Sequence, residues 1–321
     1  MKNESPIYSY YYPLTTSCET LRQRTLANGG NTPTDETVLC QTARSLFVGH
    51  SQPNIYSFDG SPESSTWDDI EPRVMQAQID LAQQYGVDGF IFDTYVGVKD
   101  GKVSKEKDVI NGFLKCSLGR TAYACMMIFG SPRSILPVLP YFEEPDRYYD
   151  RTSQTVETMV DYLADNHWDN PNYINILDRP YVSVFTSDMR KYSNEQVIKR
   201  VEEWDTIQEQ IDKPYIPPVV VGWDASPRGS IPEGRHFRDV QGMYPFTPIV
   251  TDSNAIDFGD MLCQQKRFIM NNTPQEERYT PITAWNEITE GAALLPKILP
   301  DGSVDDSYLA KIRELRDEYG F

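Results

Sequence analysis

Residues 279–291 read YTPITAWNEITEG, a β-prone run that ends in two carboxylates and a glycine. The part before Trp285 predicts a strand, and Gly291 breaks the chain after it. Glu287 and Glu290 therefore stand close together where the predicted strand ends. Two neighbouring carboxyl groups do not ionise independently, and glycosidic bond hydrolysis uses one protonated and one ionised carboxyl group. The alternative for the pair alone is a solvated Glu-x-x-Glu spacing, which many helices contain by chance.

Strands and helices are predicted to alternate along the chain, which favours a parallel sheet wrapped by helices. The predicted strands are residues 7–12, 87–93, 121–129, 181–185, 219–223, 241–246 and 281–286, and the predicted helices are residues 68–85, 105–116, 153–166, 194–211, 256–271 and 307–319. This set is one strand short of a closed eight-stranded barrel. Residues 173–177 are a candidate for the eighth strand, as a hairpin partner of residues 181–185. The expected fold class is α/β, a (β/α)8 TIM-barrel-like single domain with room for irregular, inserted loops.

The helix predicted at residues 68–85 has a regular apolar face and is followed by a buried strand. Its apolar positions at helical spacing are Ile70, Val74, Ala77, Leu81 and Ala82. Gly86 ends the helix. Residues 87–93 then contain the run Phe-Ile-Phe, which is apolar without alternation and predicts a strand that is covered on both faces.

One domain is expected over residues 1–321, because no internal repeat, low-complexity tract or long Pro/Gly/Ser linker divides the chain. An atypical polar insert occupies about residues 15–65. A segment of that length without periodicity is usually a functional lid or carries structure of its own.

Composition and charge exclude several classes of protein. Hydrophobic residues make up 39% and charged residues 24%, which is ordinary for a soluble globular protein and excludes a mostly disordered chain. No apolar run approaches the ~20 residues of a membrane span. The formal net charge of −17 repels phosphate backbones, so no nucleic-acid partner is expected. Neither C-x-x-C nor H-E-x-x-H spacing occurs, so no metal and no cofactor are expected.

The first residues bear on the compartment. Residues 1–6 lack the apolar core of a signal peptide. A cytoplasmic protein is expected if Met1 is the native first residue, and a secreted or periplasmic one if a leader was removed. The sequence leaves the compartment and the oligomeric state open.

Six segments carry a resemblance to known families. They are IYSYYYP (residues 7–13), GHSQP (49–53), LAQQYGVDGF (81–90), GWDASPR (222–228), AWNEITEGAALLP (284–296) and YLAKIR (308–313). In this order they resemble glycoside hydrolase family 99 and the WbsX-like polysaccharide-biosynthesis proteins, whose last strand usually reads Asn-Glu-Trp-x-Glu-Gly. The sequence departs from that pattern in two places. Ile288 replaces the aromatic residue, and the polar residues 17–45 replace a Trp-rich run, so the identity of the substrate is not carried over.

The resemblance implies a barrel fold and a chemistry. Family 99 enzymes are retaining endo-α-mannosidases, in which one Glu deprotonates the substrate's own 2-hydroxyl group so that it attacks the anomeric carbon. By position, Glu287 would be that base, and Glu290 the acid for the leaving group and then the base for water. His50 lies in a family-like segment, where it either contacts a sugar hydroxyl or fixes its loop by a hydrogen bond.

Further candidate residues follow the predicted strands, at the end where barrel active sites are built. The predicted sugar-binding residues are Tyr10, Tyr12, His50, Asp93, Tyr95, Trp223, Asp224, Arg228, Tyr244 and Asn286. Aromatic rings suit the C–H face of a pyranose, while carboxylates and amides bind its hydroxyls. The alternatives are core packing for each aromatic residue, a turn or cap for Asp93, an Asx-turn for Asp224, and a side-chain-to-backbone bond for Asn286.

The expected function is hydrolysis of an α-linked glycan by a family 99-like enzyme. A glycosyltransferase of surface-polysaccharide biosynthesis is the first alternative, and the missing phosphate-cradling glycine motifs count modestly against it. A non-catalytic carbohydrate-binding protein is the second, favoured by Ile288 and by the absent Trp-rich run. The expected partner in all three cases is a glycan or polysaccharide.

Overall fold

The computed structural model describes residues 5–12, 52–53, 72–99, 102–105, 109–128, 153–185, 215–223, 250, 253–287, 291–298 and 303–320. The described helices are α3 (Pro72–Tyr85), α4 (Val109–Leu114), α5 (Ser153–Asn166), α9 (Ala255–Asn272) and α10 (Ser307–Tyr319), with the 3-10 helix η3 (Gln275–Glu277). The main sheet contains β1 (Ile7–Tyr11), β3 (Gly89–Lys99), β4 (Lys102–Lys105), β5 (Ala122–Ile128), β8 (Val182–Phe185), β9 (Val219–Val220) and β10 (Thr280–Thr283). The short strands are β2 (Gln52–Pro53), β6 (Asn175–Ile176), β7 (Arg179–Pro180), β11 (Asn286–Glu287), β12 (Ala292–Ala293), β13 (Lys297–Ile298) and β14 (Val304–Asp305).

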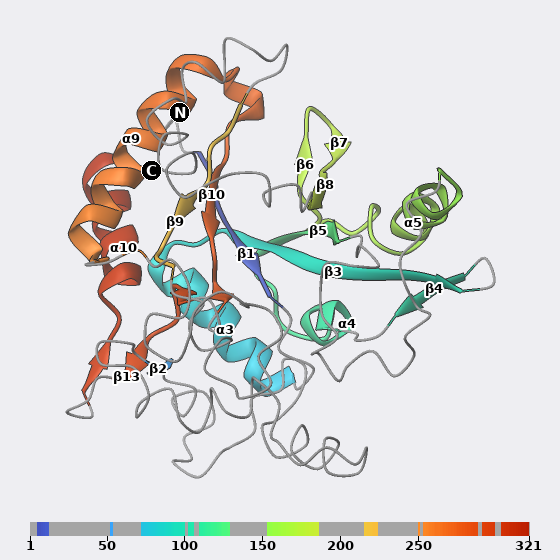
Figure 1. Cartoon of the computed structure of the whole chain (residues 1–321), viewed down its shortest axis with the longest axis horizontal. Coiled ribbons are helices and arrows are strands. Elements are labelled where there is room, and N and C mark those ends of the chain that lie inside the picture. Colours follow the sequence, from blue (N-terminus) through green and yellow to red (C-terminus); the bar gives the residue numbers. More distant parts are fainter. Residues whose placement is uncertain are drawn as a thin grey trace, which may run out of the picture.

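The centre of the molecule is a parallel sheet with the order β8-β5-β3-β1-β10-β9 (Figure 1). The first strand, β1, lies between β3 and β10, and Tyr8 is level with both Gly89 and Pro281. β4 continues the sheet as an antiparallel partner of the outer half of β3. The predicted α/β class with a parallel sheet is confirmed. Within the described residues the sheet remains open, with β8 and β9 at its edges.

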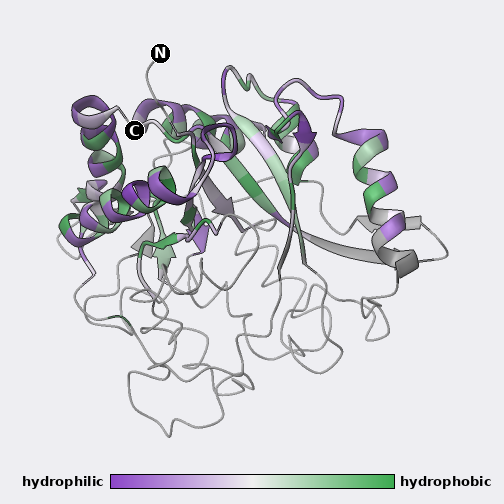
Figure 2. Cartoon of the chain, turned by 90° about the horizontal axis from the view of Figure 1, so that it is seen from above, coloured by the Kyte–Doolittle hydropathy of each residue, from purple (hydrophilic) through white to green (hydrophobic). Residues whose placement is uncertain are grey.

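Helices cover one face of the sheet, and the main hydrophobic core lies between the two layers. α10 packs between α9 and α3, and α3 also contacts α4. Tyr11, Phe90 and Phe92 pack together beneath α3, with ring centroids 4.8 to 6.0 Å apart. In Figure 2 the helices carry both purple and green residues, as amphipathic helices do, beside largely green central strands.

The buried face of α3 differs from the predicted one by about one position. Its buried residues are Val74, Met75, Gln78, Ile79, Ala82 and Tyr85. Ala77 and Leu81 are only partly buried, although their spacing predicted a core role. The difference arises because a polar residue, Gln78, occupies the centre of the buried face. Gly86 ends the helix as predicted, with φ of +84°.

The other face of the sheet is lined by tyrosines. Tyr8 and Tyr10 alternate with the core residues of β1 and point away from α3. The Tyr279 ring lies 6.0 Å from that of Tyr8 and 5.5 Å from that of Tyr181, and the Tyr181 and Tyr279 hydroxyls are 3.3 Å apart. Burial raises the pKa of Tyr8 to about 12, and the negative charge of Asp88 adds to the rise. Tyr8 therefore stays protonated well above neutral pH.

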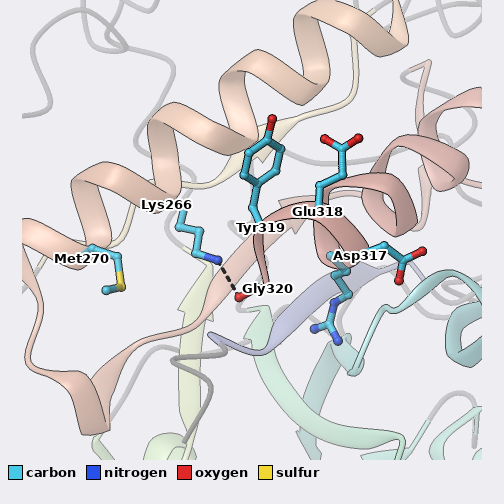
Figure 3. Close-up of a pocket in the computed structure, with 7 residues that line it drawn as sticks. Lys266, Met270, Asp317, Glu318, Tyr319 and Gly320 are labelled. Carbon is cyan, nitrogen blue, oxygen red and sulfur yellow. Dashed lines mark hydrogen bonds between the residues drawn. The ribbon is translucent and has the colours of Figure 1, made fainter.

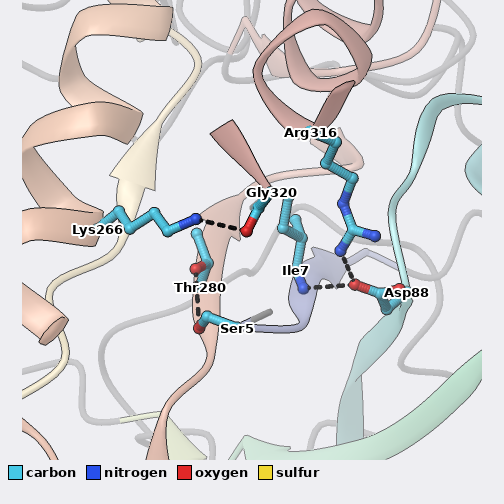
Figure 4. Close-up of polar contacts among 7 residues, drawn as sticks. All are labelled: Ser5, Ile7, Asp88, Lys266, Thr280, Arg316 and Gly320. Carbon is cyan, nitrogen blue, oxygen red and sulfur yellow. Dashed lines mark hydrogen bonds and ion pairs between the residues drawn. The ribbon is translucent and has the colours of Figure 1, made fainter. Parts of the chain in front are cut away.

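The amino ends of β1 and β3 are joined to the last helix (Figure 4). Asp88 accepts a hydrogen bond of 2.8 Å from the Ile7 backbone N–H and forms an ion pair with Arg316. Burial raises the pKa of Asp88, and the Arg316 guanidinium offsets part of that rise. A Cβ atom at Gly86 would lie 2.5 Å from Arg316 Cδ, so this glycine both ends α3 and leaves space for the arginine. Lys266 donates to the Gly320 carbonyl at 2.9 Å and holds the end of α10.

Several sequence expectations need correction. The strand predicted at residues 87–93 extends to Lys99, because it gains the antiparallel partner β4. Lys105, predicted to begin a helix, ends that partner strand instead. The last strand ends at Thr283, and Asn286 belongs to a separate antiparallel hairpin. Residues 173–177 do form a hairpin, but β6 pairs with β7 outside the main sheet. The helix predicted at 194–211 and the strand predicted at 241–246 lie outside the described residues.

The buried tyrosine layer predicts a loss of stability in alkali. An unfolded tyrosine has a pKa near 10, so between pH 10 and 12 the unfolded chain releases protons that folded Tyr8 retains. Stability from this group is complete below about pH 10 and falls as the pH rises towards 12, by roughly 1 kcal/mol at pH 11. Urea unfolding at pH 9 and pH 11 should show a smaller loss for Tyr8→Phe than for the wild type. An equal loss in both proteins would contradict the prediction.

Candidate functional site

The predicted Glu pair begins in a small hairpin at the carboxyl end of β10. The Trp285 N–H, two residues beyond β10, donates to the Tyr10 carbonyl of β1 at 2.7 Å. The chain then turns away as β11, which pairs antiparallel with β12, so that Glu287 lies opposite Ala292. Gly291, between these strands, has φ of +63°, which favours glycine. Leu294 and Leu295 donate back to the Trp285 carbonyl at 3.0 and 3.2 Å and close the hairpin.

Asn286 clamps this hairpin to the end of β1. Its Oδ1 accepts from the Tyr12 N–H at 2.8 Å, and its Nδ2 donates to the Tyr12 carbonyl at 2.7 Å. The Asn286 side chain thus makes the two hydrogen bonds to the Tyr12 backbone that a neighbouring strand would otherwise make. Asn286 is fully buried, and the side-chain-to-backbone role that the sequence left open is the one observed. A contact between Asn286 and a substrate hydroxyl stays a prediction.

Glu287 is the charged residue that this arrangement presents at the carboxyl end of the sheet. It is 9% exposed, an unusual degree of burial for a glutamate. It directly follows Asn286, which is bonded to Tyr12, and it pairs with Ala292 across the hairpin. These two contacts fix the position of its backbone. A carboxyl group on a rigid frame suits acid–base chemistry, in which positioning decides the rate. Glu290 lies outside the described residues.

Tyr10, Tyr12 and Asp93 lie together on the sheet face opposite α3. Asp93 is one residue beyond the pair Tyr11–Phe92, which makes it level with Tyr12. The pKa of Tyr10 is raised well above its usual value, first by burial, then by Tyr181 and by the negative charge of Asp93. Three of the predicted site residues are therefore neighbours at the carboxyl ends of β1 and β3.

Trp223 comes three residues after β9, beside the hairpin. It is 37% exposed, and its carbonyl accepts from the Val250 N–H at 2.8 Å. The preceding residue, Gly222, lies so close to the hairpin that a Cβ atom there would be 3.3 Å from the Gly291 carbonyl oxygen. The exposed Trp223 side chain thus belongs to the residue next to Gly222, which approaches Gly291 of the hairpin.

The remaining predicted residues are not all described. Tyr95 lies on β3, level with Ile128, while its side chain falls outside the described part. His50, Asp224, Arg228 and Tyr244 lie outside the described residues. Across the described residues no group of three or more His, Cys, Asp or Glu side chains is placed to hold a metal ion. No described helix is long and apolar enough to cross a membrane.

The sequence reasoning missed Gln78, which touches the site's frame from α3. Its Oε1 accepts from Trp285 Nε1–H at 2.9 Å, and its Nε2 donates to the Tyr11 hydroxyl at 2.8 Å. All three side chains are fully buried. A local signal did exist, because Gln78 lies four residues after Val74 on an otherwise apolar helix face.

A cavity lined by described residues lies away from this site. Its volume is about 460 Å3, and it is lined by Lys266, Met270, Arg316, Asp317, Glu318, Tyr319 and Gly320 (Figure 3). Arg316 holds Asp88 at the amino end of β3, so the cavity lies at the opposite end of the strands from Glu287. In parallel α/β folds that end serves stability rather than catalysis, and the ion pair and helix-end contact found here fit that role.

Comparison with protein families gives a match over residues 34–102, to the family described as Glycosyltransferase WbsX. Over this range the chain is similar to that family. The matched range contains α3, all of β3 and the second half of the polar insert at about 15–65. Comparison with curated protein sequences gives no significant match.

Solved structures resemble the chain over nearly its whole length. The GH99 endo-alpha-mannosidase from Bacteroides thetaiotaomicron has a TM-score of 0.58 at 12% identity, with 98% of this chain and 97% of that chain covered. The same enzyme in complex with bis-tris-propane gives 0.56 at 14% identity and the same coverage. A glycoside hydrolase-like protein gives 0.54 at 13% identity, covering 97% and 93%. At these identities the likeness is one of fold, and the resemblance indicated by the motifs is confirmed.

The Asn286 clamp predicts a large cost for a substitution of similar volume. Asn286→Leu leaves the buried N–H and carbonyl of Tyr12 without partners and should lower the free energy of unfolding by about 2–4 kcal/mol. Asn175 is the matched control, because its Nδ2 also donates to a backbone carbonyl, that of Tyr173 at 2.9 Å, but its side chain is exposed. Asn175→Leu should cost less than about 1 kcal/mol. Similar urea midpoints for the two variants would refute the clamp.

Proposed function

We propose that this protein is a retaining glycoside hydrolase that cleaves an α-linked glycan, as an endo-α-mannosidase does. The observation that carries the proposal is the buried Glu287 on a clamped hairpin at the carboxyl end of β10. The family 99 fold likeness, which covers nearly the whole chain, supports it. The exposed Trp223 and the group of Tyr10, Tyr12 and Asp93 at the same end suit a carbohydrate partner.

The proposed architecture is a (β/α)8 barrel. The strands β1, β3, β5 and β8 follow one another around the sheet in chain order, and β10 returns to lie beside β1. That is the order of a barrel wound in one direction, whereas a doubly wound sheet reverses direction partway. Further strand pairing between β8 and β9 would close it. The likeness to family 99 structures supports this closure.

The proposed mechanism gives each Glu one task. Glu287 takes the proton of the substrate's 2-hydroxyl group, whose oxygen attacks the anomeric carbon and displaces the leaving-group oxygen. Glu290 protonates that leaving group, then removes a proton from the water that opens the strained ring at the anomeric carbon, while Glu287 returns its proton to the 2-oxygen. Two displacements at one carbon retain its configuration. Only two residues separate the pair, so their Cα atoms are at most about 11 Å apart.

Glu290 is predicted to act on the leaving group. Glu290→Gln should lower turnover of an unactivated glycan at least ~100-fold, the usual contribution of a positioned general acid. The loss should be much smaller for an aryl glycoside, whose leaving group needs little protonation. Glu287→Gln serves as the comparison, because losing the base should slow both substrates alike. Equal losses on both substrates for Glu290→Gln would assign that residue another role.

The 2-hydroxyl nucleophile makes a second, independent prediction. A 2-deoxy-2-fluoro substrate lacks that hydroxyl and should be turned over poorly without labelling the protein. Proton NMR of the first product formed from a natural substrate should show the retained anomer. Intact mass spectrometry that finds a glycosyl group on Glu287 would replace the mechanism by a direct Glu nucleophile, and an inverted product would exclude both.

The second candidate function is a glycosyltransferase, favoured by the WbsX family match. The experiment that separates the two is digestion of a glycan library without any nucleotide-sugar donor. Release of free sugar, lost in Glu290→Gln, supports the hydrolase. Sugar transfer that depends on an added nucleotide sugar supports the transferase. Glycan affinity that survives Glu290→Gln, with no turnover by the wild type under either condition, indicates a carbohydrate-binding protein.

A further inference from the structure

The fully buried Gln78 joins the ends of the two strands that frame the candidate site. It lies on α3, and it bonds to Tyr11 at the end of β1 and to Trp285 just after β10, at 2.8 and 2.9 Å. The residues that directly follow Tyr11 and Trp285 are Tyr12 and Asn286, and the Asn286 clamp bonds them to each other. Glu287 follows at once. Two successive cross-links, one through Gln78 and one through Asn286, therefore precede the candidate catalytic carboxylate.

A glutamine at this position has a cost that an apolar residue would not have. A buried amide is unfavourable unless its hydrogen bonds are made, and apolar residues of similar volume usually pack as well or better. Its neighbours on the buried face include Val74, Met75, Ile79 and Ala82, which shows that the surroundings suit an apolar side chain. The amide does what no apolar side chain can do, because it fixes the orientation of an indole ring through a directional bond.

We propose that Gln78 is a positioning residue for Glu287 that acts through Trp285, an inference that rests on the proposed hydrolase function. The indole also packs against Phe90, with ring centroids 5.1 Å apart, so Gln78 and Phe90 together determine where the ring lies. Trp285 sets the start of the hairpin, since its N–H bonds to Tyr10 and its carbonyl accepts from Leu294 and Leu295. A shift of the ring would move the hairpin and the carboxylate with it.

The chain contains a matched control in Gln265. This glutamine is also fully buried, and its Nε2 donates to the carbonyls of Pro217 and Pro281. It links the segment before β9 to β10, as Gln78 links β1 to the residue after β10. Pro281 is the second residue of β10 and precedes Trp285 by four residues. If both glutamines have only a structural role, substituting either one should change kcat to the same extent. If Gln78 positions Glu287, only the substitution of Gln78 should lower kcat.

The first test compares Gln78→Met with Gln265→Met in the full chain, using an α-linked manno-oligosaccharide that the wild type cleaves. Both variants should melt at a lower temperature than the wild type. Only Gln78→Met should lower kcat, by about 10- to 100-fold with KM changed less than about 3-fold, because a small misplacement of a catalytic group slows the chemical step. Equal kcat values in the two variants would overturn the proposal.

The second test addresses the path through Trp285. If Gln78 acts by orienting the indole, the losses in kcat for Gln78→Met and Trp285→Phe should not add, and the double variant should be no slower than the slower single variant. Multiplied losses would show that Gln78 does not act through Trp285.

The third test requires no activity. Amide hydrogen exchange at Trp285 and Leu294, whose N–H groups hold the hairpin, should be about 10-fold faster in Gln78→Met and unchanged in Gln265→Met, with both compared at equal stability. Equal exchange in the two variants overturns the proposal. If the wild type cleaves no glycan, the hydrolase function fails, and this measurement still decides whether Gln78 holds the hairpin.

Discussion

The parallel pairing of β1 with β10 is the constraint on which the rest of the structure depends. Ile7 is level with Thr280, so the first and last strands of the sheet are neighbours although almost the whole chain separates them. This pairing brings Asp88, Ile7 and Arg316 together at one end of the strands. At the other end it brings Tyr12 to Asn286, and Tyr11 and Trp285 to the same glutamine. Each group needs residues from both halves of the chain.

The two ends of the sheet use different kinds of polar contact. At the amino end, partly exposed charges hold the last helix against β1 and β3, and such pairs stabilise modestly. At the carboxyl end, uncharged amides make buried hydrogen bonds to backbone and aromatic groups, and the candidate carboxylate stands beside them. This frame holds the hairpin of Glu287 in place through Asn286 and Gln78, neither of which carries a charge.

The sequence predicted the periodic elements well. The helices Ser153–Asn166 and Ser307–Tyr319 have the predicted bounds, and the strands at residues 7–12 and 121–129 are correct to within one residue at each end. These segments have strong apolar periodicity or clear end signals, which are local properties. The extension of β3 to Lys99 and the hairpin after β10 were not predicted, because each depends on a partner strand and not on the segment's own pattern. The position of Gln78 on the apolar face of α3 was a local signal, but its role could not be predicted because its partners Tyr11 and Trp285 lie far away in the sequence.

The central place of β1 has a consequence for synthesis on the ribosome. β1 emerges before its partner β10, because residues 12–279 lie between the two strands. Until then β1 has at most one neighbour, β3, and its other edge presents free N–H and carbonyl groups to any strand that it meets. While residues 12–279 are being made, β1 is open to pairing with a wrong strand, so we expect the yield in a cell to depend on chaperones and on the rate of translation as well as on final stability.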